Sequence, residues 1–400
     1  MKKIYLIVLA IFCITSGVKS QWMWDINIMR EIKKNIKDTA YTTAYDNLIR
    51  DAERRLDIKP YSVTYKEGVA PSGDNRDYVS LSRYVWPDPS KPDGLPYIHR
   101  DGVSNPELEK YDRNPLGNMA SAVNALCLAY FFSNDERYAT KAVDFLKTWF
   151  LDEKTGMNPH LEYAQFIPGV NNNKGRQYGL IDTYSFVDML NSIKLIETSA
   201  SYTKEVNEGL KKWFGKLSVW WQTSEQGVAE KRGSNNHGLA YDVQLVMFAL
   251  FADDKETALK VIDEYPKTRI YKQIQPDGAQ PEELRRTLAF HYSQYNISHM
   301  VDMVAIAKSI GIDLLTAKSE DGRSLFKAVD FLTPYLGKEV SEWPYQQISG
   351  WRESQLALCE DIYRIVIIDP SLKEYSEIYK KYGRKSPADR KRLIYGVKDK

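Results

Sequence analysis

The sequence predicts an all-α fold, an (α/α) toroid or incomplete barrel built from antiparallel helix pairs in a single domain. Apolar residues recur at helical i, i+3 and i+4 spacing along most of the chain. Alternation of apolar and polar residues, the signature of a half-buried strand, is scarce. With 43% hydrophobic and 12% aromatic residues, the chain can build a large core.

The first twenty residues are predicted to be a signal peptide, residues 1–20, and not part of the fold. Lys2 and Lys3 form a positive start, 4–14 is an apolar run, and 18–20 suits cleavage before Gln21. The run is too short to span a membrane, and no later apolar run is long enough. We therefore expect an exported protein, periplasmic or secreted.

Stripes of apolar side chains define the helices in order. Met119, Val123 and Cys127 mark the first stripe, and Leu210 and Trp221 lie on another. The predicted helical segments are 119–130, 142–150, 182–199, 210–221, 239–252, 255–264, 282–310, 324–336 and 351–367.

Two long segments rich in proline and glycine, 86–106 and 166–179, connect these helices. Chain length alone allows two or three domains, but helical pairs continue on both sides of each segment. We therefore predict one domain over residues 21–400. Long loops in a compact domain are often functional, and a toroid would gather them at one end, beside a cleft suited to a long polymer.

Charge and cysteine content exclude several classes of protein. A formal net charge of +2 does not indicate a nucleic-acid-binding protein, which is usually strongly basic. Cys127 and Cys359 lie in apolar helical patterns and are expected to be buried free thiols. Cys13 follows Phe12, which fits a lipoprotein cleavage box poorly.

Motifs for metal, phosphate and serine-hydrolase chemistry are absent from the sequence. It has no HExxH, glycine-rich phosphate loop or Gly-x-Ser-x-Gly elbow, and no evident carboxylate pair for hydrolysis. His291 and His299 alone approach the spacing of metal ligands, and a shared helix face explains that spacing. We therefore expect no metal site and no cofactor.

The segment 233–238, Gly-Ser-Asn-Asn-His-Gly, precedes the apolar helical run 239–251. A lone histidine is usually structural, but His237 follows Asn235 and Asn236 at a helix entry, where backbone and amide donors gather. An imidazole is largely neutral near pH 7 and can accept a proton. His237 is therefore a candidate base.

A second concentration of polar residues follows at 277–286, and then His291 and Tyr292. On one continuous helix, Arg285 would share the face of Tyr292, and Arg286 would lie about a third of a turn away. Nearby cations favour the phenolate, so Tyr292 could take as well as give a proton. An amide and an arginine can hold a carboxylate, so the two segments together indicate proton abstraction beside a carboxylate, as in the cleavage of polyuronic acids.

The chain resembles the alginate lyase family of polysaccharide lyases over about residues 75–355. The two most specific motifs are Asn235-Asn236-His237-Gly238 with Tyr241-Asp242-Val243-Gln244, and Asp277-Gly278-Ala279-Gln280-Pro281 with Glu283-Leu284, Arg286-Thr287 and His291-Tyr292-Ser293. Weaker matches lie at 78–81, 86–89, 93–97, 158–169 and 179–182.

This resemblance implies helical-toroid enzymes that act by β-elimination, with a role for each of four residues. Asn236 and Arg286 would neutralise the substrate carboxylate, and Tyr292 would protonate the departing O4. Either Tyr292 or His237 would remove the C5 proton. Where that proton and O4 are syn, one tyrosine can serve both steps; where they are anti, His237 is the natural base.

The resemblance and the helical geometry disagree on one arginine. The family position favours Arg286, whereas a continuous helix favours Arg285, which we keep as a substrate-binding candidate. Leu288 also replaces a basic residue frequent in relatives. The full set of predicted substrate contacts is Trp86, Gln165, Arg176, Tyr241, Arg285 and His291.

These observations favour a metal-independent lyase for an acidic polysaccharide, with alginate as the preferred substrate. We expect a monomer with no nucleic-acid partner and no stable membrane span. The end of the chain shortly after its helices favours an endolytic mode over trimming of chain ends. A glucuronan lyase needs the same four roles and is the nearest rival. A non-catalytic glycan-binding protein and a glycoside hydrolase are two further classes that the same toroid could carry.

Overall fold

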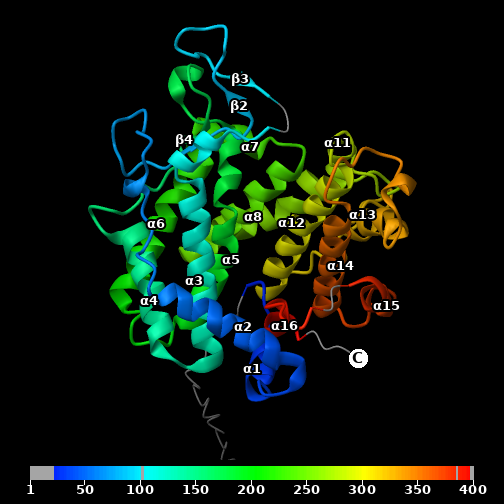
Figure 1. The fold of residues 1–400 in the computed structure, drawn as a ribbon. Helices are drawn as coiled ribbons and strands as arrows, with labels where there is room; N and C mark the ends of the chain where they lie inside the picture. Colours follow the sequence, from blue (N-terminus) through cyan, green and yellow to red (C-terminus); the bar gives the residue numbers. More distant parts are fainter. Residues whose placement is uncertain (1–21, 101–102, 384–385, 397–400) are drawn as a thin grey trace, which may run out of the picture.

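Helices form most of the regular structure of the computed structural model, which describes residues 22–100, 103–383 and 386–396 (Figure 1). The predicted signal peptide, 1–20, lies outside these residues. The helices are α1 (Ile26–Lys34), α2 (Thr39–Leu56), α3 (Arg113–Ser133), α4 (Glu136–Leu146), α5 (Ser185–Ile193), α6 (Lys204–Thr223), α7 (Glu225–Lys231), α8 (Asn236–Phe251), α9 (Lys255–Tyr265), α10 (Tyr271–Gln273), α11 (Pro281–Leu284), α12 (Ala289–Ser309), α13 (Leu325–Leu332), α14 (Trp351–Ile368), α15 (Lys373–Tyr382) and α16 (Lys391–Tyr395).

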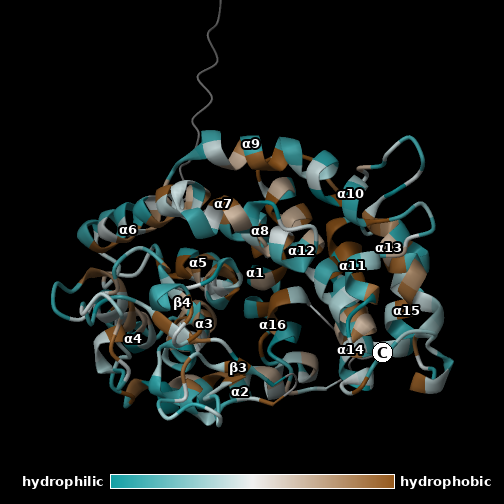
Figure 2. Ribbon diagram, turned by 90° about the horizontal axis from the view of Figure 1, so that it is seen from above, coloured by the Kyte–Doolittle hydropathy of each residue, from teal (hydrophilic) through white to brown (hydrophobic). Residues whose placement is uncertain are grey.

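The helices form two layers. In the inner layer α3, α5, α8, α12 and α14 contact one another in succession. In the outer layer α4 packs on α3, α6 and α9 pack on α8, α13 packs on α12 and α15 packs on α14. Seen from above, α5, α8, α12 and α14 follow an arc, and α6, α9, α13 and α15 lie outside it (Figure 2). The predicted all-α toroid of helix pairs is confirmed.

Inner helices are apolar on nearly every side because neighbours cover them all round. Every residue of α8 is buried except His237. The outer helix α4 instead buries one stripe, which includes Tyr138, Val143 and Leu146. Loops of a few residues join α3 to α4 and α8 to α9, so each of these pairs is antiparallel.

Two N-terminal helices lie outside the predicted set. Asp25 and Asp38 cap α1 and α2, since the carboxylate of each accepts a hydrogen bond from a backbone N–H in the first turn. Both helices contact α16, so a C-terminal helix packs against the two N-terminal ones.

The prediction of one helix over 282–310 is wrong. α11 ends at Leu284, and α12 begins at Ala289. Between them, Thr287 and Leu288 run beside the segment 346–348: the Ala289 N–H donates to the Gln346 carbonyl (2.9 Å), and the Ile348 N–H donates to the Thr287 carbonyl (3.1 Å). These bonds replace helical ones and separate the two arginines from the helix that carries Tyr292.

Four short strands lie within or just before the long loops, at one end of the helices (Figure 1). β1 (Val79–Leu81) pairs in parallel with β4 (Tyr163–Phe166), and β2 (Val85–Trp86) pairs antiparallel with β3 (Ile98–His99). The predicted loops 86–106 and 166–179 therefore lie beside each other, at the same end as α11.

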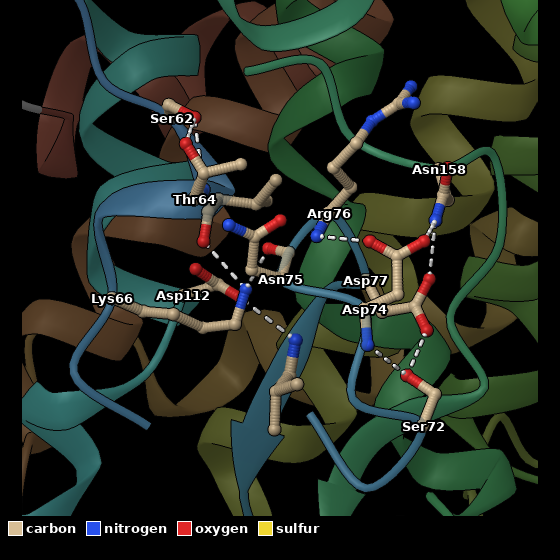
Figure 3. Close-up of polar contacts among 12 residues, drawn as sticks. Ser62, Thr64, Lys66, Ser72, Asp74, Asn75, Arg76, Asp77, Asp112 and Asn158 are labelled. Atoms are coloured by element: carbon tan, nitrogen blue, oxygen red, sulfur yellow. Dashed lines mark hydrogen bonds and ion pairs between the residues drawn. The ribbon is translucent and has the colours of Figure 1, made fainter. Parts of the chain in front are cut away.

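A buried polar network anchors the segment before β1 (Figure 3). The Lys66 ammonium lies 3.2 Å from Asp112, whose carboxylate accepts the Val79 N–H at 2.9 Å. Burial raises the pKa of Asp112 to about 7, opposed by Lys66. Asp77 accepts a hydrogen bond from Asn158 at 2.6 Å on the other side of this segment. β1 is therefore fixed from both sides.

Cys127 and Cys359 are free and buried, as predicted. Within the described ranges α3 is the helix with the length and apolar composition to cross a membrane. Its apolar side chains pack against α2, α4 and α5 in the core.

Candidate active site

The entry to α8 holds the first group of candidate residues. The Asn235 side chain caps the helix by accepting the His237 N–H at 3.2 Å. The chain folds back tightly here, and a Cβ atom added to Gly238 would lie 2.2 Å from the Gly233 carbonyl oxygen. Glycine at 238 therefore lets the loop close over the helix start, where His237 is the one residue of α8 that is partly exposed.

Asn236 is held by a buried carboxylate from the second group. Glu283 on α11 accepts the Asn236 backbone N–H at 2.7 Å and the Nδ2 amide at 3.1 and 2.9 Å. Burial raises the pKa of Glu283, and the bonds from Asn236 oppose that shift. The two oxygens of one carboxylate lie in similar directions from Nδ2, whereas the two amide N–H bonds diverge, so one N–H can serve both oxygens. The second N–H points away from Glu283, on a side chain that is 1% exposed.

His237 is held by another buried carboxylate. Its Nδ1 lies 2.7 Å from Glu230 Oε1 on α7. The Tyr178 ring meets the imidazole edge-on, with ring centroids 5.3 Å apart. Glu230 and Tyr178 therefore hold the imidazole in place, while 20% of the His237 side chain stays exposed.

Arg286 and Tyr292 form a direct pair. The guanidinium carbon of Arg286 lies 3.8 Å from the centroid of the Tyr292 ring. Arg285 instead points outward, is 68% exposed and forms an ion pair with Glu282. The prediction that Arg285 shares the helix face of Tyr292 is wrong, because residues 285–288 are not helical.

Two further predicted residues, Gln165 on β4 and Arg176 in the loop after it, form with Asp182 a group that we call the platform. Gln165 has a φ of 50°, in the left-handed region, and its amide donates to Asp182 at 2.9 Å. Arg176 donates to the Gln165 carbonyl (3.1 Å) and to the Ser82 hydroxyl (2.7 Å). Both partners are neutral, so no carboxylate hydrogen-bonded to Arg176 in the described residues cancels its charge. Burial lowers the pKa of Arg176.

Asp182 organises this platform. It accepts hydrogen bonds from the Tyr78 hydroxyl at 3.0 Å and the Ser80 hydroxyl at 2.5 Å, both beside or on β1. Ser80 in turn accepts the Gln165 N–H at 2.7 Å. The parallel pairing of β1 with β4 therefore fixes the Gln165 side chain through one buried acid.

Two residues at this site were missed in the sequence. Arg113, the first residue of α3, lies 3.6 Å from Asp182 and is one-third exposed. Tyr178 links the platform to α8, because its ring also lies 5.4 Å from the Arg176 guanidinium. Tyr178 could have been found as an exposed aromatic in the long 166–179 loop. Nothing in the local sequence marks Arg113, since its partner is 69 residues away.

His291 lines a neighbouring cavity of about 360 Å³, bounded by Leu288, His291, Gln294, Ser349, Gly350, Glu353, Ser354 and Ala357. Its ring is stacked on Tyr295, with centroids 5.9 Å apart. Burial, followed by the charge of Arg286, lowers the pKa of His291. The imidazole is therefore neutral at neutral pH and can contact a ligand in this cavity.

Two further predicted contacts form hydrogen bonds within the protein. Tyr241 is 1% exposed, stacks on Trp221 and donates its hydroxyl to the Trp221 carbonyl at 3.2 Å. Tyr241 also lines a cavity of about 310 Å³ beside Asp242 and Arg269, and its substrate contact stays a prediction. Trp86 lies on the β2–β3 hairpin, where its indole N–H donates to the Val103 carbonyl at 2.9 Å.

The arrangement combines an imidazole, a phenol and cations around one region. Glu283 joins the two groups, since it binds Asn236 and lies three residues before Arg286. Arg113, Arg176 and Arg286 bring guanidinium groups to the site, and such groups suit carboxylates. Such a site can bind a carboxylate and move a proton next to it.

Comparisons with known proteins point to one family. The family model described as alginate lyase matches residues 62–343. The crystal structure of an alginate lyase from Bacteroides ovatus is similar, with 48% identity and a TM-score of 0.91 over 94% of this chain and 99% of that chain. Alginate lyase A1-III from Sphingomonas species A1 is similar in fold, with 14% identity and a TM-score of 0.57 over 91% of this chain and 98% of that chain.

A variant of A1-III in complex with a tetrasaccharide has the same 14% identity, with a TM-score of 0.56 over 91% of this chain and 97% of that chain. No curated protein matches the chain.

Proposed function

The chain belongs to the alginate lyase family and is a polysaccharide lyase, and from this premise we propose that it cleaves alginate by β-elimination. The observation that carries the proposal is the pairing of Arg286 with Tyr292 beside the α8 entry that presents Asn236 and His237. The similar proteins from Bacteroides ovatus and Sphingomonas species A1 are themselves alginate lyases.

The proposed reaction starts at the uronate carboxylate. Arg286 and the free N–H of Asn236 bind it and stabilise the negative charge that develops when the C5 proton leaves. The C5–H electron pair forms the C4–C5 double bond as the C4–O4 bond breaks, and O4 takes a proton from Tyr292. The products are one chain with a new reducing end, whose C1 hydroxyl carries the former bridging oxygen, and one with an unsaturated uronate at its non-reducing end.

Stereochemistry decides which residue takes the C5 proton. In mannuronate and glucuronate this proton and O4 are syn, so Tyr292 can act first as base and then as acid. In guluronate they are anti, and the base must approach from the face opposite Tyr292. We assign that role to His237, because it is the one residue of α8 that is partly exposed.

We propose an endolytic mode as well. His291, next to Tyr292 in sequence, lines a cavity, and Arg176 is linked to His237 through the ring of Tyr178. Polymer on both sides of the cleaved bond would then find polar contacts. The test is the chain length of the products early in the reaction. An endolytic enzyme gives a broad series of oligosaccharides, whereas release of single end units would contradict this mode.

The direct test is a Tyr292→Phe variant assayed on alginate, polymannuronate, polyguluronate and glucuronan. Formation of the unsaturated uronate is followed by its ultraviolet absorbance. Loss of the proton donor should lower kcat by about 10²- to 10⁴-fold on every polymer that the unaltered protein cleaves. Tyr65→Phe, at a tyrosine that is 49% exposed elsewhere, is the matched control. Full activity of Tyr292→Phe would show that the assigned acid is wrong.

A further inference from the structure

Glu230 lies directly beneath His237 without contacting the surface. It occupies the last turn of α7, and its side chain is 2% exposed, against 20% for His237. The Oε1 to Nδ1 distance of 2.7 Å is that of a charge-assisted hydrogen bond. The two residues come from different helices, so the loop between α7 and α8 sets this contact.

The hydrogen bond selects one tautomer of His237. An ionised carboxylate can only accept hydrogen bonds, so the hydrogen must lie on Nδ1. In the neutral imidazole the other nitrogen, Nε2, then carries the lone pair. Because Glu230 covers Nδ1, the exposed part of the ring presents Nε2, the nitrogen that can accept a proton.

The second oxygen of Glu230 favours a positive charge on His237. Glu230 Oε2 is buried, and no hydrogen-bond donor reaches it in the described residues. A buried carboxylate with an unpaired oxygen is costly, and a positive charge beside it lowers that cost. Proton uptake by His237 supplies such a charge at 2.7 Å.

Other ionisable groups face His237 from each neighbouring element. Tyr178 contacts the ring from the loop before α5, at 5.3 Å between centroids. Glu283 on α11 and His299 on α12 interact with it electrostatically. Glu283 is already bonded to Asn236, and His299 is fully buried. Glu230 is thus the carboxylate that binds the imidazole directly.

We propose that Glu230 is the positioning residue for base catalysis by His237. It holds Nδ1–H, directs the Nε2 lone pair to the substrate, and stabilises the imidazolium formed when Nε2 takes the C5 proton. The C5–H electrons become the C4–C5 double bond, and O4 leaves with the Tyr292 proton. The imidazolium then returns its proton to solvent. This role rests on the proposed lyase function and applies to guluronate, where the base and Tyr292 act on opposite faces.

Glu230→Gln and Glu230→Asp test the proposal against Glu225→Gln, a change of an exposed glutamate in the first turn of the same helix. Glu230→Gln should lower kcat on polyguluronate by about 10²-fold, with KM nearly unchanged. The acidic limb of its pH profile should move to lower pH, because removal of the negative charge disfavours imidazolium. Glu230→Asp keeps the charge and should restore part of the rate, and polymannuronate cleavage should change by only a few fold.

Imidazole nitrogen chemical shifts from NMR give a readout that needs no activity. The unaltered protein should show His237 protonated at Nδ1 when neutral. Protonation at Nε2, an unchanged pH limb in Glu230→Gln, or an unaltered protein inert on polyguluronate but active on polymannuronate would each overturn the role of Glu230. Failure to cleave any polyuronate would overturn the proposed function instead. If Glu230→Gln does not fold, the Asp variant and the NMR tautomer still decide.

Discussion

Neighbouring arginines at 285 and 286 have opposite surroundings. Arg286 lies over the Tyr292 ring, whereas Arg285 is mostly exposed and pairs with Glu282. Exposed ion pairs contribute about 0–1 kcal/mol, so Arg285 has little to hold it in one place. A guanidinium packed on an aromatic face is already ordered before a carboxylate arrives.

Arg286→Ala should therefore lower kcat/KM on the preferred polymer by about 10²- to 10³-fold, the usual cost of removing one oxyanion-stabilising group. Arg285→Ala should change it by no more than about 3-fold. Steady-state kinetics on the two variants compare positions one residue apart. A larger loss for Arg285→Ala would assign the carboxylate contact to Arg285.

Residue types near the site were predictable, but their partners were not. Asn236 and His237 could be named from a helix-entry motif. Glu230, which holds His237, has an ordinary local sequence. Glu283 belongs to a family motif, but its contact with Asn236, 47 residues away, could not be read from that motif. A sequence motif also does not say that the helix of Tyr241 is covered on all sides.

Elements were predictable where one helix face dominates. The periodic stripes gave the inner and outer helices and hence the toroid. The break at 285–288 could not be found this way, because it depends on pairing with 346–348, some sixty residues later. α1 and α2 were not predicted, although each has an aspartate cap and buries a stripe at helical spacing, such as Ile26, Met29 and Ile32 in α1.

The distant segment also caps α12. No side chain of the residue before α12 caps it, and instead the Gln347 Oε1 accepts the Phe290 N–H (3.0 Å) and the His291 N–H (3.3 Å). Tyr292 is the next residue along. The start of α12, and with it the direction of the phenol, therefore depends on Gln347.

Gln347→Ala should lower the free energy of unfolding by about 1 kcal/mol, the typical loss for a helix cap. It should also lower kcat, since the first turn of α12 becomes less ordered. Denaturant unfolding and steady-state kinetics measure the two effects. Gln346→Ala is the control, because Gln346 contributes its backbone carbonyl, which alanine retains. Equal behaviour of both variants would rule out a capping role for the Gln347 side chain.

At the scale of the whole molecule, the toroid brings distant segments to one end. β1 and β4, the α8 entry and the α12 start are far apart in sequence, yet buried acids connect them: Asp182 to β1 and β4, Glu283 to α8. The net charge of +2 says little about a polyanion site. The individual side chains matter instead: Arg176 has only neutral hydrogen-bond partners in the described residues, and Arg286 packs on the Tyr292 ring.

The centre of the toroid makes stability depend on pH. His299 on α12 is fully buried between Tyr184 and Tyr295, with ring centroids 4.4 and 4.3 Å away. Neither of its ring nitrogens has a hydrogen-bond partner in the described residues. Burial lowers its pKa to about 3, so the folded protein keeps His299 neutral in mild acid.

An unfolded chain protonates histidine near its ordinary pKa of about 6.5, so between that pH and about 3 the unfolded state binds the extra proton. The free energy of unfolding therefore falls progressively as the pH falls through this window. The loss due to His299 reaches about 2 kcal/mol at pH 5. His299→Leu should remove that slope. The drop in unfolding free energy between pH 7.5 and pH 5 should shrink by about 2 kcal/mol, measured by denaturant unfolding at both pH values. His99→Leu, at an exposed histidine on β3, should leave the drop unchanged. An unchanged drop in His299→Leu would mean that the folded protein protonates His299 as readily as the unfolded chain does, which a buried imidazole without partners should not allow.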